Sequence, residues 1–87
     1  MNKYFVKVEV KLKTLVLDPQ GKAVSSALHN LGYDEVKNTR IGKLIELSIE
    51  DESEEKVRES VTDMCNKLLA NTVIEDYSIH ISEDNNA

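Results

Sequence analysis

The first part of the chain alternates between apolar and mostly charged side chains. The apolar set is Tyr4, Val6, Val8, Val10 and Leu12. All of the residues between them and just after them are Lys or Glu, except Phe5. A period of two predicts a β-strand with one face on a core and the other facing water or a partner. The run is longer than the usual strand of about 5–6 residues, so we expect part of it to extend beyond its own sheet.

A helical pattern follows. Asp18 supplies the carboxylate with which an N-cap accepts a backbone N–H bond, and Pro19 suits the first helical position because proline has no N–H to leave unpaired. The next apolar residues fall on one helical stripe, namely Val24, Ala27, Leu28 and Leu31. Gly32 then suits the left-handed residue at which many helices end. These signals predict a helix over residues 19–31.

Two strands are predicted after this helix. The first covers roughly residues 35–41. Gly42 is expected to break it or to form a tight turn, since glycine tolerates a positive φ. Ile45, Leu47 and Ile49 then alternate with polar residues and indicate the second strand.

An acidic run over residues 50–55 leads into a second helix. Ser53 is the predicted N-cap, and the carboxylates after it complement the positive end of the helix dipole. Asp63 and Lys67 are spaced for an ion pair. The buried stripe is predicted to contain Val57, Val61, Met64, Cys65 and Leu68. The helix should end near residues 70–71, where Asn71 is a second choice for a left-handed stop.

Tyr77, Ile79 and Ile81 alternate as a last strand, which makes the element order β-α-β-β-α-β. Two βαβ halves with right-handed crossovers predict an α+β fold, a ferredoxin-like plait whose antiparallel sheet carries both helices on one face. We expect one domain over residues 1–82 and a frayed polar tail over residues 83–87. The uncovered sheet face should present Phe5, Lys7, Glu9, Lys11, Leu44 and Glu46.

Composition limits the function classes. An 87-residue chain allows one domain with a thin core, so partner surfaces are expected to add to its stability. The net charge of −5 argues against nucleic-acid binding, because phosphate contacts need a basic footprint. No apolar run approaches the ~20 residues of a membrane span, and the N-terminus leads into a strand rather than a signal peptide. A single cysteine excludes an internal disulfide and fits a cytoplasmic protein.

Reactive side chains offer no catalytic or metal site. Cys65 lies on a buried stripe with no flanking histidine, so a core role is favoured over a nucleophilic one. His29 and His80 belong to no metal-ligand spacing, and surface or interface roles are favoured for both. The acidic run lacks the ligand spacing and central glycine of a calcium loop. We therefore predict no catalytic residue, no metal and no cofactor bound by this chain.

Two nucleotide-binding interpretations fail on particular residues. The segment 21–23 (Gly-Lys-Ala) is similar to the end of a phosphate-binding loop, but Val16 and Ala23 stand where that loop needs Gly and Ser or Thr. An RNA-recognition domain shares the predicted topology, yet it stacks bases on exposed aromatic residues of its central strands. The third predicted strand offers Leu44, Glu46 and Ser48 instead.

Lys22, Arg40 and Lys43 remain as a candidate cationic cluster in an acidic protein. Gly21 and Gly42 beside them would allow another backbone to approach closely. Spacing alone leaves two interpretations open, which are a docking patch for a partner and ordinary scattered surface charge.

Three segments carry a family resemblance. They are residues 16–24 (Val-Leu-Asp-Pro-Gln-Gly-Lys-Ala-Val), the triplet 31–33 (Leu-Gly-Tyr), and residues 40–43 (Arg-Ile-Gly-Lys) leading into Ile45-Glu46-Leu47. In this order and spacing they resemble the PurS family, the small subunit of phosphoribosylformylglycinamidine synthase. The resemblance covers almost the whole chain. Thr72 departs from it, since proline is expected there, and affects only the local turn.

The resemblance implies a non-catalytic role in purine biosynthesis. In such complexes a glutaminase subunit (PurQ) releases ammonia from glutamine. A synthetase subunit (PurL) uses ATP, with Mg, to convert formylglycinamide ribonucleotide into formylglycinamidine ribonucleotide. The small subunit forms homodimers or tetramers and bridges the other two, assisting ammonia transfer. The docking residues expected here are Asp18, Gln20, Gly21, Lys22, Arg40, Gly42 and Lys43.

The alternative from another class is a small regulatory plait that binds a ligand between paired domains. It requires a ligand-shaped pocket at a dimer interface. A stand-alone enzyme has almost no support, because the sequence shows no nucleophile–base constellation.

Overall fold

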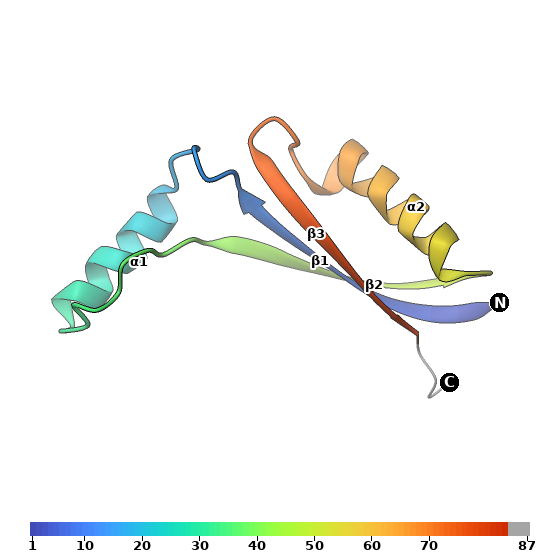
Figure 1. Cartoon of the computed structure of the whole chain (residues 1–87), viewed down its shortest axis with the longest axis horizontal. Helices are drawn as coiled ribbons and strands as arrows, with labels where there is room; N and C mark the ends of the chain where they lie inside the picture. Colours follow the sequence, from blue (N-terminus) through green and yellow to red (C-terminus); the bar gives the residue numbers. More distant parts are fainter. Residues whose placement is uncertain (84–87) are drawn as a thin grey trace.

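The sheet of this protein has three strands, in the order β2-β1-β3. The computed structural model describes residues 1–83. The strands are β1 (Asn2–Leu12), β2 (Gly42–Asp51) and β3 (Glu75–Glu83), and both β2 and β3 pair antiparallel with β1. The helices are α1 (Pro19–Asn30) and α2 (Glu54–Met64), the latter continuing into a π-helical turn, η1 (Cys65–Leu69). In Figure 1, α2 lies along the sheet and α1 stands beyond its end.

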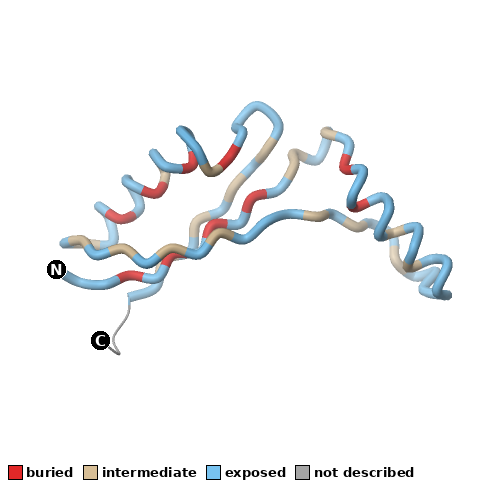
Figure 2. Tube along the Cα trace, turned by 180° about the vertical axis from the view of Figure 1, so that it is seen from behind, coloured by how far each residue is buried: buried red, intermediate tan, exposed pale blue. Residues whose placement is uncertain are grey.

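The alternation in β1 becomes one side of the core. Its inward residues, Tyr4, Val6, Val8 and Val10, are at most 4% exposed. They face Val57, Val61 and Cys65, which belong to α2 and η1 and are fully buried. Figure 2 shows these buried positions along the central strand and along the helix above it. The predicted strand parity and the core role of Cys65 are confirmed.

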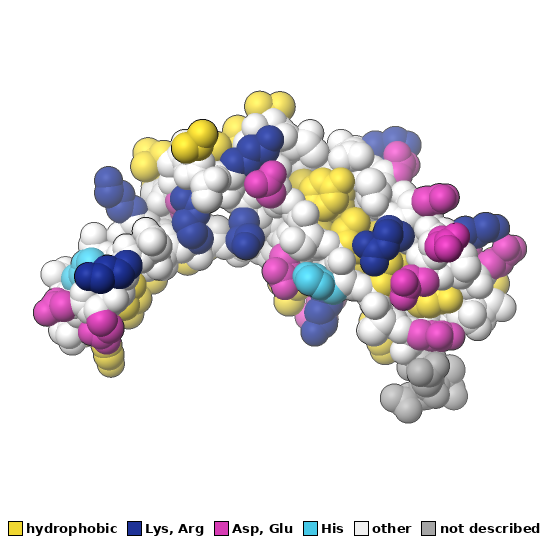
Figure 3. Space-filling view, viewed as in Figure 1, with side chains coloured by type: hydrophobic (Ala, Val, Ile, Leu, Met, Phe, Trp, Pro, Cys, Tyr) yellow, Lys and Arg dark blue, Asp and Glu magenta, His cyan; other side chains and the backbone are white. Residues whose placement is uncertain are grey.

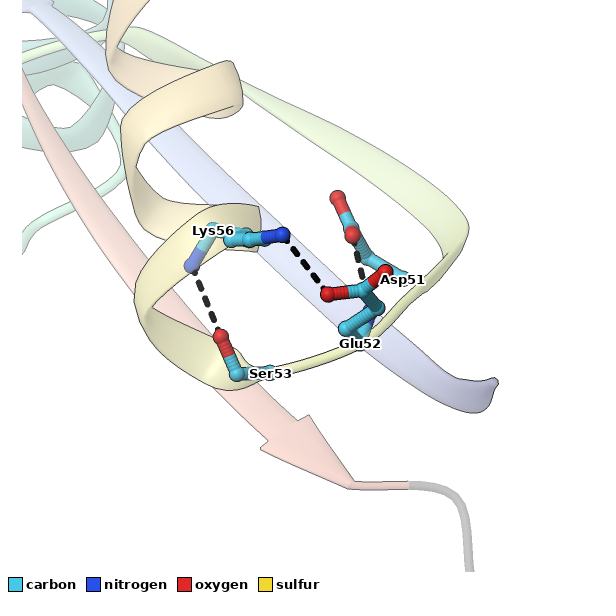
Figure 4. Close-up of polar contacts among 4 residues, drawn as sticks. All are labelled: Asp51, Glu52, Ser53 and Lys56. Carbon is cyan, nitrogen blue, oxygen red and sulfur yellow. Dashed lines mark hydrogen bonds and ion pairs between the residues drawn. The ribbon is translucent and has the colours of Figure 1, made fainter.

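The start of α2 is capped as predicted. The Lys56 backbone N–H donates to Ser53 Oγ at 3.3 Å, and Lys56 Nζ lies 2.7 Å from Glu52 Oε2 (Figure 4). Where α2 passes into η1, the predicted pair between Asp63 and Lys67 forms at 2.9 Å. Since both pairs are exposed, each contributes little beyond local helix stability.

The π-helical turn η1 changes which residues of the apolar stripe of the second helix are buried. Because η1 closes i→i+5 bonds, the 3.6-residue period does not continue through it. Leu68 is 83% exposed and Met64 is 37% exposed, whereas Leu69 and Ala70 pack on the core. The predictions that Met64 and Leu68 are buried are therefore wrong.

The end of η1 matches the predicted position but not the predicted conformation. Ala70 donates its backbone N–H to the Cys65 carbonyl oxygen at 3.0 Å and adopts an extended conformation with φ −133°. Within residues 1–83 only Gly32 has a positive φ. The left-handed stop expected at Asn71 is therefore wrong.

Residues 35–41 form no strand, and this prediction is wrong. The segment runs back along α1 (Figure 1), and its polar groups bond to that region. The Val36 carbonyl oxygen lies 2.8 Å from His29 Nε2, and the Ile41 N–H donates to Asp18. Gly42 neither breaks a strand nor forms a turn, because it is the first residue of β2 and pairs with Lys11. The element order is thus β-α-β-α-β, and the ferredoxin-like α+β class is kept with three strands in place of four.

Helix α1 begins at the predicted Pro19 and ends at Asn30 rather than at residue 31, and its apolar stripe is left open. Its C-cap is Leu31, followed by Gly32 at φ 99°. Val24 is 39% exposed and Leu31 74% exposed. The radius of gyration is 16.7 Å, against about 12 Å for a compact domain of this length. The chain is therefore elongated, and its first helix has no sheet of its own to cover. Glu83, placed in the predicted tail, ends β3, and residues 84–87 lie outside the described part.

Candidate functional site

Asp18 joins the start of α1 to the start of β2. Its Oδ1 accepts the Gly21 N–H at 2.9 Å, which is the predicted N-cap bond, and its Oδ2 accepts the Ile41 N–H at 2.9 Å. The bond from Ile41, then that from Gly21, and to a smaller extent the charge of Arg40, hold the pKa of this carboxyl below its ordinary 3.8, against the raising effect of burial. The residue is only 7% exposed, so a buried charge has an N–H partner for each oxygen.

Two glycines allow the backbone to approach closely here. A Cβ on Gly21 would overlap the Thr39 carbonyl oxygen, and a Cβ on Gly42 would lie 2.6 Å from the Val10 carbonyl oxygen. We expected these glycines to admit another backbone, and the backbone that approaches is that of the chain itself. Gly21 and Gly42 therefore shape the site from inside.

Arg40 links the irregular segment to the end of β1. Its Nη2 donates to the carbonyl oxygens of Leu12 at 3.0 Å and Lys13 at 2.9 Å. These bonds orient the guanidinium, while Nη1 and Nε take no part in them. The exposed side chain is thus fixed in place and keeps donors for an incoming anion.

The predicted cationic cluster divides between two neighbouring hollows. Lys22 and Arg40 line an open hollow of about 440 Å³, and Lys43 and Gln20 line a second one of about 250 Å³. Asp18 lines both. The structure therefore brings Lys22 and Arg40 together and places Lys43 beside them.

One cation of the larger hollow was missed by the sequence analysis. Lys37 lines it together with Asn38, Thr39 and Arg40. These four polar residues are consecutive, which is not the alternation of a half-buried strand. That signal could have assigned the segment to a polar loop over α1.

Other reactive groups lie apart from these hollows. Cys65 is fully buried, and burial raises the pKa of its thiol. His80 Nε2 lies 3.6 Å from Glu9 Oε1, and both side chains are exposed. Among residues 1–83 no three His, Cys, Asp or Glu side chains gather as metal ligands do. In that same range no helix is both long and apolar enough to cross a membrane.

Known proteins resemble this chain over most of its length. Residues 5–83 match the family model described as PurS, phosphoribosylformylglycinamidine (FGAM) synthase. The chain is 56% identical over 80 residues to the phosphoribosylformylglycinamidine synthase subunit PurS of Bacillus subtilis. The aligned stretch covers 92% of this chain and 94% of that protein.

Solved structures show the same likeness. The crystal structure of Methanocaldococcus jannaschii PurS, a subunit of formylglycinamide ribonucleotide amidotransferase, matches with a TM-score of 0.86 and 45% identity, covering 94% of this chain and 99% of that one. A chain in the structure of PurLQS from Thermotoga maritima matches with a TM-score of 0.87 and 33% identity, covering 94% and 100%.

Proposed function

Since the chain belongs to the PurS family, as a subunit of FGAM synthase in purine biosynthesis, we propose that it bridges the glutaminase subunit (PurQ) and the synthetase subunit (PurL) and assists ammonia transfer between them. The observation that carries this proposal is the match to a chain of the Thermotoga maritima PurLQS structure, which covers all of that chain. The reaction served is the ATP- and glutamine-dependent conversion of formylglycinamide ribonucleotide to the amidine, in the cytoplasm.

The chain contributes no active site of its own to this ligase. Its one thiol is buried, and His29 and His80 contact a backbone carbonyl oxygen and Glu9 rather than a nucleophile. We propose accordingly that ATP, Mg and glutamine are bound by the other subunits. Purified alone, the chain should release no glutamate from glutamine.

A bridge is chemically useful because ammonia attacks only when it is unprotonated. Bulk water would protonate and dilute it. Holding two active sites together raises its effective concentration without a new catalytic group, and excluding water protects an activated intermediate from hydrolysis.

The proposal includes self-association into a homodimer or tetramer. The elongated shape and the open stripe of α1 support it, because exposed apolar stripes on a thin domain are typical of subunit interfaces. A second copy that covers the stripe around Val24 and Leu31 would supply the core that α1 lacks.

The docking patch is proposed at the two hollows. Asp18, Gly21 and Gly42 shape it from inside, as their contacts with Ile41, Thr39 and Val10 indicate. The exposed side chains directed to a partner are those of Gln20, Lys22, Arg40 and Lys43. Positive charge on an acidic chain is suited to an acidic surface of either partner subunit.

Reconstitution with purified PurL and PurQ tests the function. Amidine synthesis is measured with glutamine and, separately, with an ammonium salt as nitrogen source. Omitting the chain should abolish synthesis from glutamine and spare synthesis from ammonia, since free ammonia bypasses the bridge. Equal glutamine-driven rates with and without the chain would show that the proposal is wrong.

A further inference from the structure

We propose that the larger hollow is a socket for a segment of a partner subunit that carries carboxylates beside apolar side chains. This inference rests on the proposed function and deepens it. The socket residues are Leu15, Leu17, Lys22, Lys37 and Arg40. Three of these five, Leu15, Leu17 and Lys37, lie outside the docking residues expected from the sequence.

The charge of the socket is opposite to that of the chain. Lys22, Lys37 and Arg40 converge on it in a protein with a net charge of −5. Its only acidic lining residue is Asp18, and both carboxylate oxygens of Asp18 are occupied by backbone N–H groups. The hollow therefore presents positive potential, which attracts a carboxylate and excludes a basic surface.

Arg40 is prepared to bind such a carboxylate. Two bonds from its Nη2, to the carbonyl oxygens of Leu12 and Lys13, hold the guanidinium plane in place. Its Nε and Nη1 hydrogens remain, and each can donate a single charge-assisted bond to a carboxylate oxygen. Because the side chain is already ordered, little rotamer entropy is lost when the partner binds.

The leucines indicate that the occupant is a protein segment rather than a free anion. Leu15 is 100% exposed and Leu17 is 70% exposed. Figure 3 shows apolar side chains next to Lys and Arg side chains over the connection between β1 and α1. A free phosphate or carboxylate would leave these leucines in water, whereas a protein segment with apolar neighbours would bury them.

The acidic run of this chain itself does not have the required chemistry. Residues 50–55 contain no large apolar side chain, and the described part has no exposed one between Leu44 and Met64. Glu52 is already paired with Lys56. Residues 50–55 of a second copy are therefore not the occupant. The occupant is assigned to PurL or PurQ because bridging these subunits is the function on which the socket rests.

Three double variants test the socket, each added to purified PurL and PurQ at low and high salt. Lys22→Glu with Lys37→Glu should weaken assembly at least about tenfold and flatten its salt dependence. Leu15→Ser with Leu17→Ser should also weaken it but keep the salt dependence. The matched control is Lys3→Glu with Arg58→Glu, which changes the net charge equally at exposed positions away from the hollow and should leave affinity within about twofold.

The outcomes separate the socket from the function on which it rests. Unchanged assembly by the Lys22/Lys37 variant overturns the socket alone. If the Lys22/Lys37 variant, measured alone by sedimentation, has a different mass from the wild-type chain, the hollow is an interface with a second copy. That result also overturns the socket. The socket is likewise overturned if calorimetry shows that the wild-type chain binds inorganic phosphate and that the Lys22/Lys37 variant loses this binding but still assembles normally. If the wild-type chain binds neither subunit, the proposed bridge is wrong and the socket with it.

Discussion

Asp18 Oδ2 accepts the Ile41 backbone N–H at 2.9 Å, although the two residues are 23 apart in the chain. The same carboxylate caps α1 through Gly21. One side chain therefore connects two of the three segments that carried the family resemblance, residues 16–24 and 40–43. The positions of Lys22 and Arg40 in the larger hollow depend on this connection.

Replacing Asp18 should show that it has two structural functions. Asp18→Asn keeps one oxygen for the cap but places an amide where two acceptors are needed, so one N–H loses its partner. Asp18→Ala loses both bonds. We expect the unfolding midpoint to fall by about 4 °C or more for Asn and further for Ala. Thermal melts by circular dichroism measure this, and equal midpoints for all three proteins would show that the carboxylate does not hold the segments together.

The lowered pKa of Asp18 predicts a dependence of stability on pH. Because the folded pKa lies below the unfolded value, the charged carboxylate stabilises the fold above that unfolded value. This contribution should disappear as the pH falls below about 4 and the folded group is protonated. The difference in midpoint between wild type and Asp18→Asn should therefore shrink on acidification. A difference that is constant from neutral to acidic pH would contradict this assignment.

Two glycine substitutions separate backbone conformation from close approach. Gly32→Ala places a Cβ in open space but strains a residue at φ 99°, which costs about 1–2 kcal/mol. Gly21→Ala has helical backbone, yet its Cβ would overlap the Thr39 carbonyl oxygen and approach Asp18. We expect Gly21→Ala to be the more destabilising of the two in urea unfolding. The reverse order would mean that the 35–41 segment can move away from α1 at little cost.

The elements that sequence predicted correctly are those specified by local patterns. The parity of β1, the Asp18 and Ser53 caps and the Gly32 stop each depend on a few neighbouring residues. Residues 35–41 were misassigned because their positions depend on distant partners, namely Asp18, His29 and the carbonyl oxygens at the end of β1. Lys37 was missed with this segment, although the four consecutive polar residues 37–40 argued against a strand. Leu68 was misassigned because a π-helical turn leaves no clear mark in the hydrophobic period.

Cys65 should be unreactive while the protein is folded. It is fully buried, and desolvation raises the pKa of its thiol, so the reactive thiolate is both inaccessible and scarce. Iodoacetamide should leave the native chain unlabelled from about pH 7 to pH 9 and label it completely in denaturant. Rapid labelling with an intact circular dichroism spectrum would show that η1 opens locally.

The open stripe of α1 predicts the site of self-association. Leu31 is 74% exposed in the single chain, so Leu31→Glu should leave the fold intact, since no core contact is lost. If a second copy covers this stripe, the substitution buries a charge at the interface and should convert the oligomer to a monomer in sedimentation at micromolar concentration. The matched control is Leu68→Glu, because Leu68 is a leucine of η1, outside α1, and is 83% exposed. A wild-type chain that is itself monomeric would contradict self-association, whereas dissociation by Leu68→Glu alone would move the interface to η1.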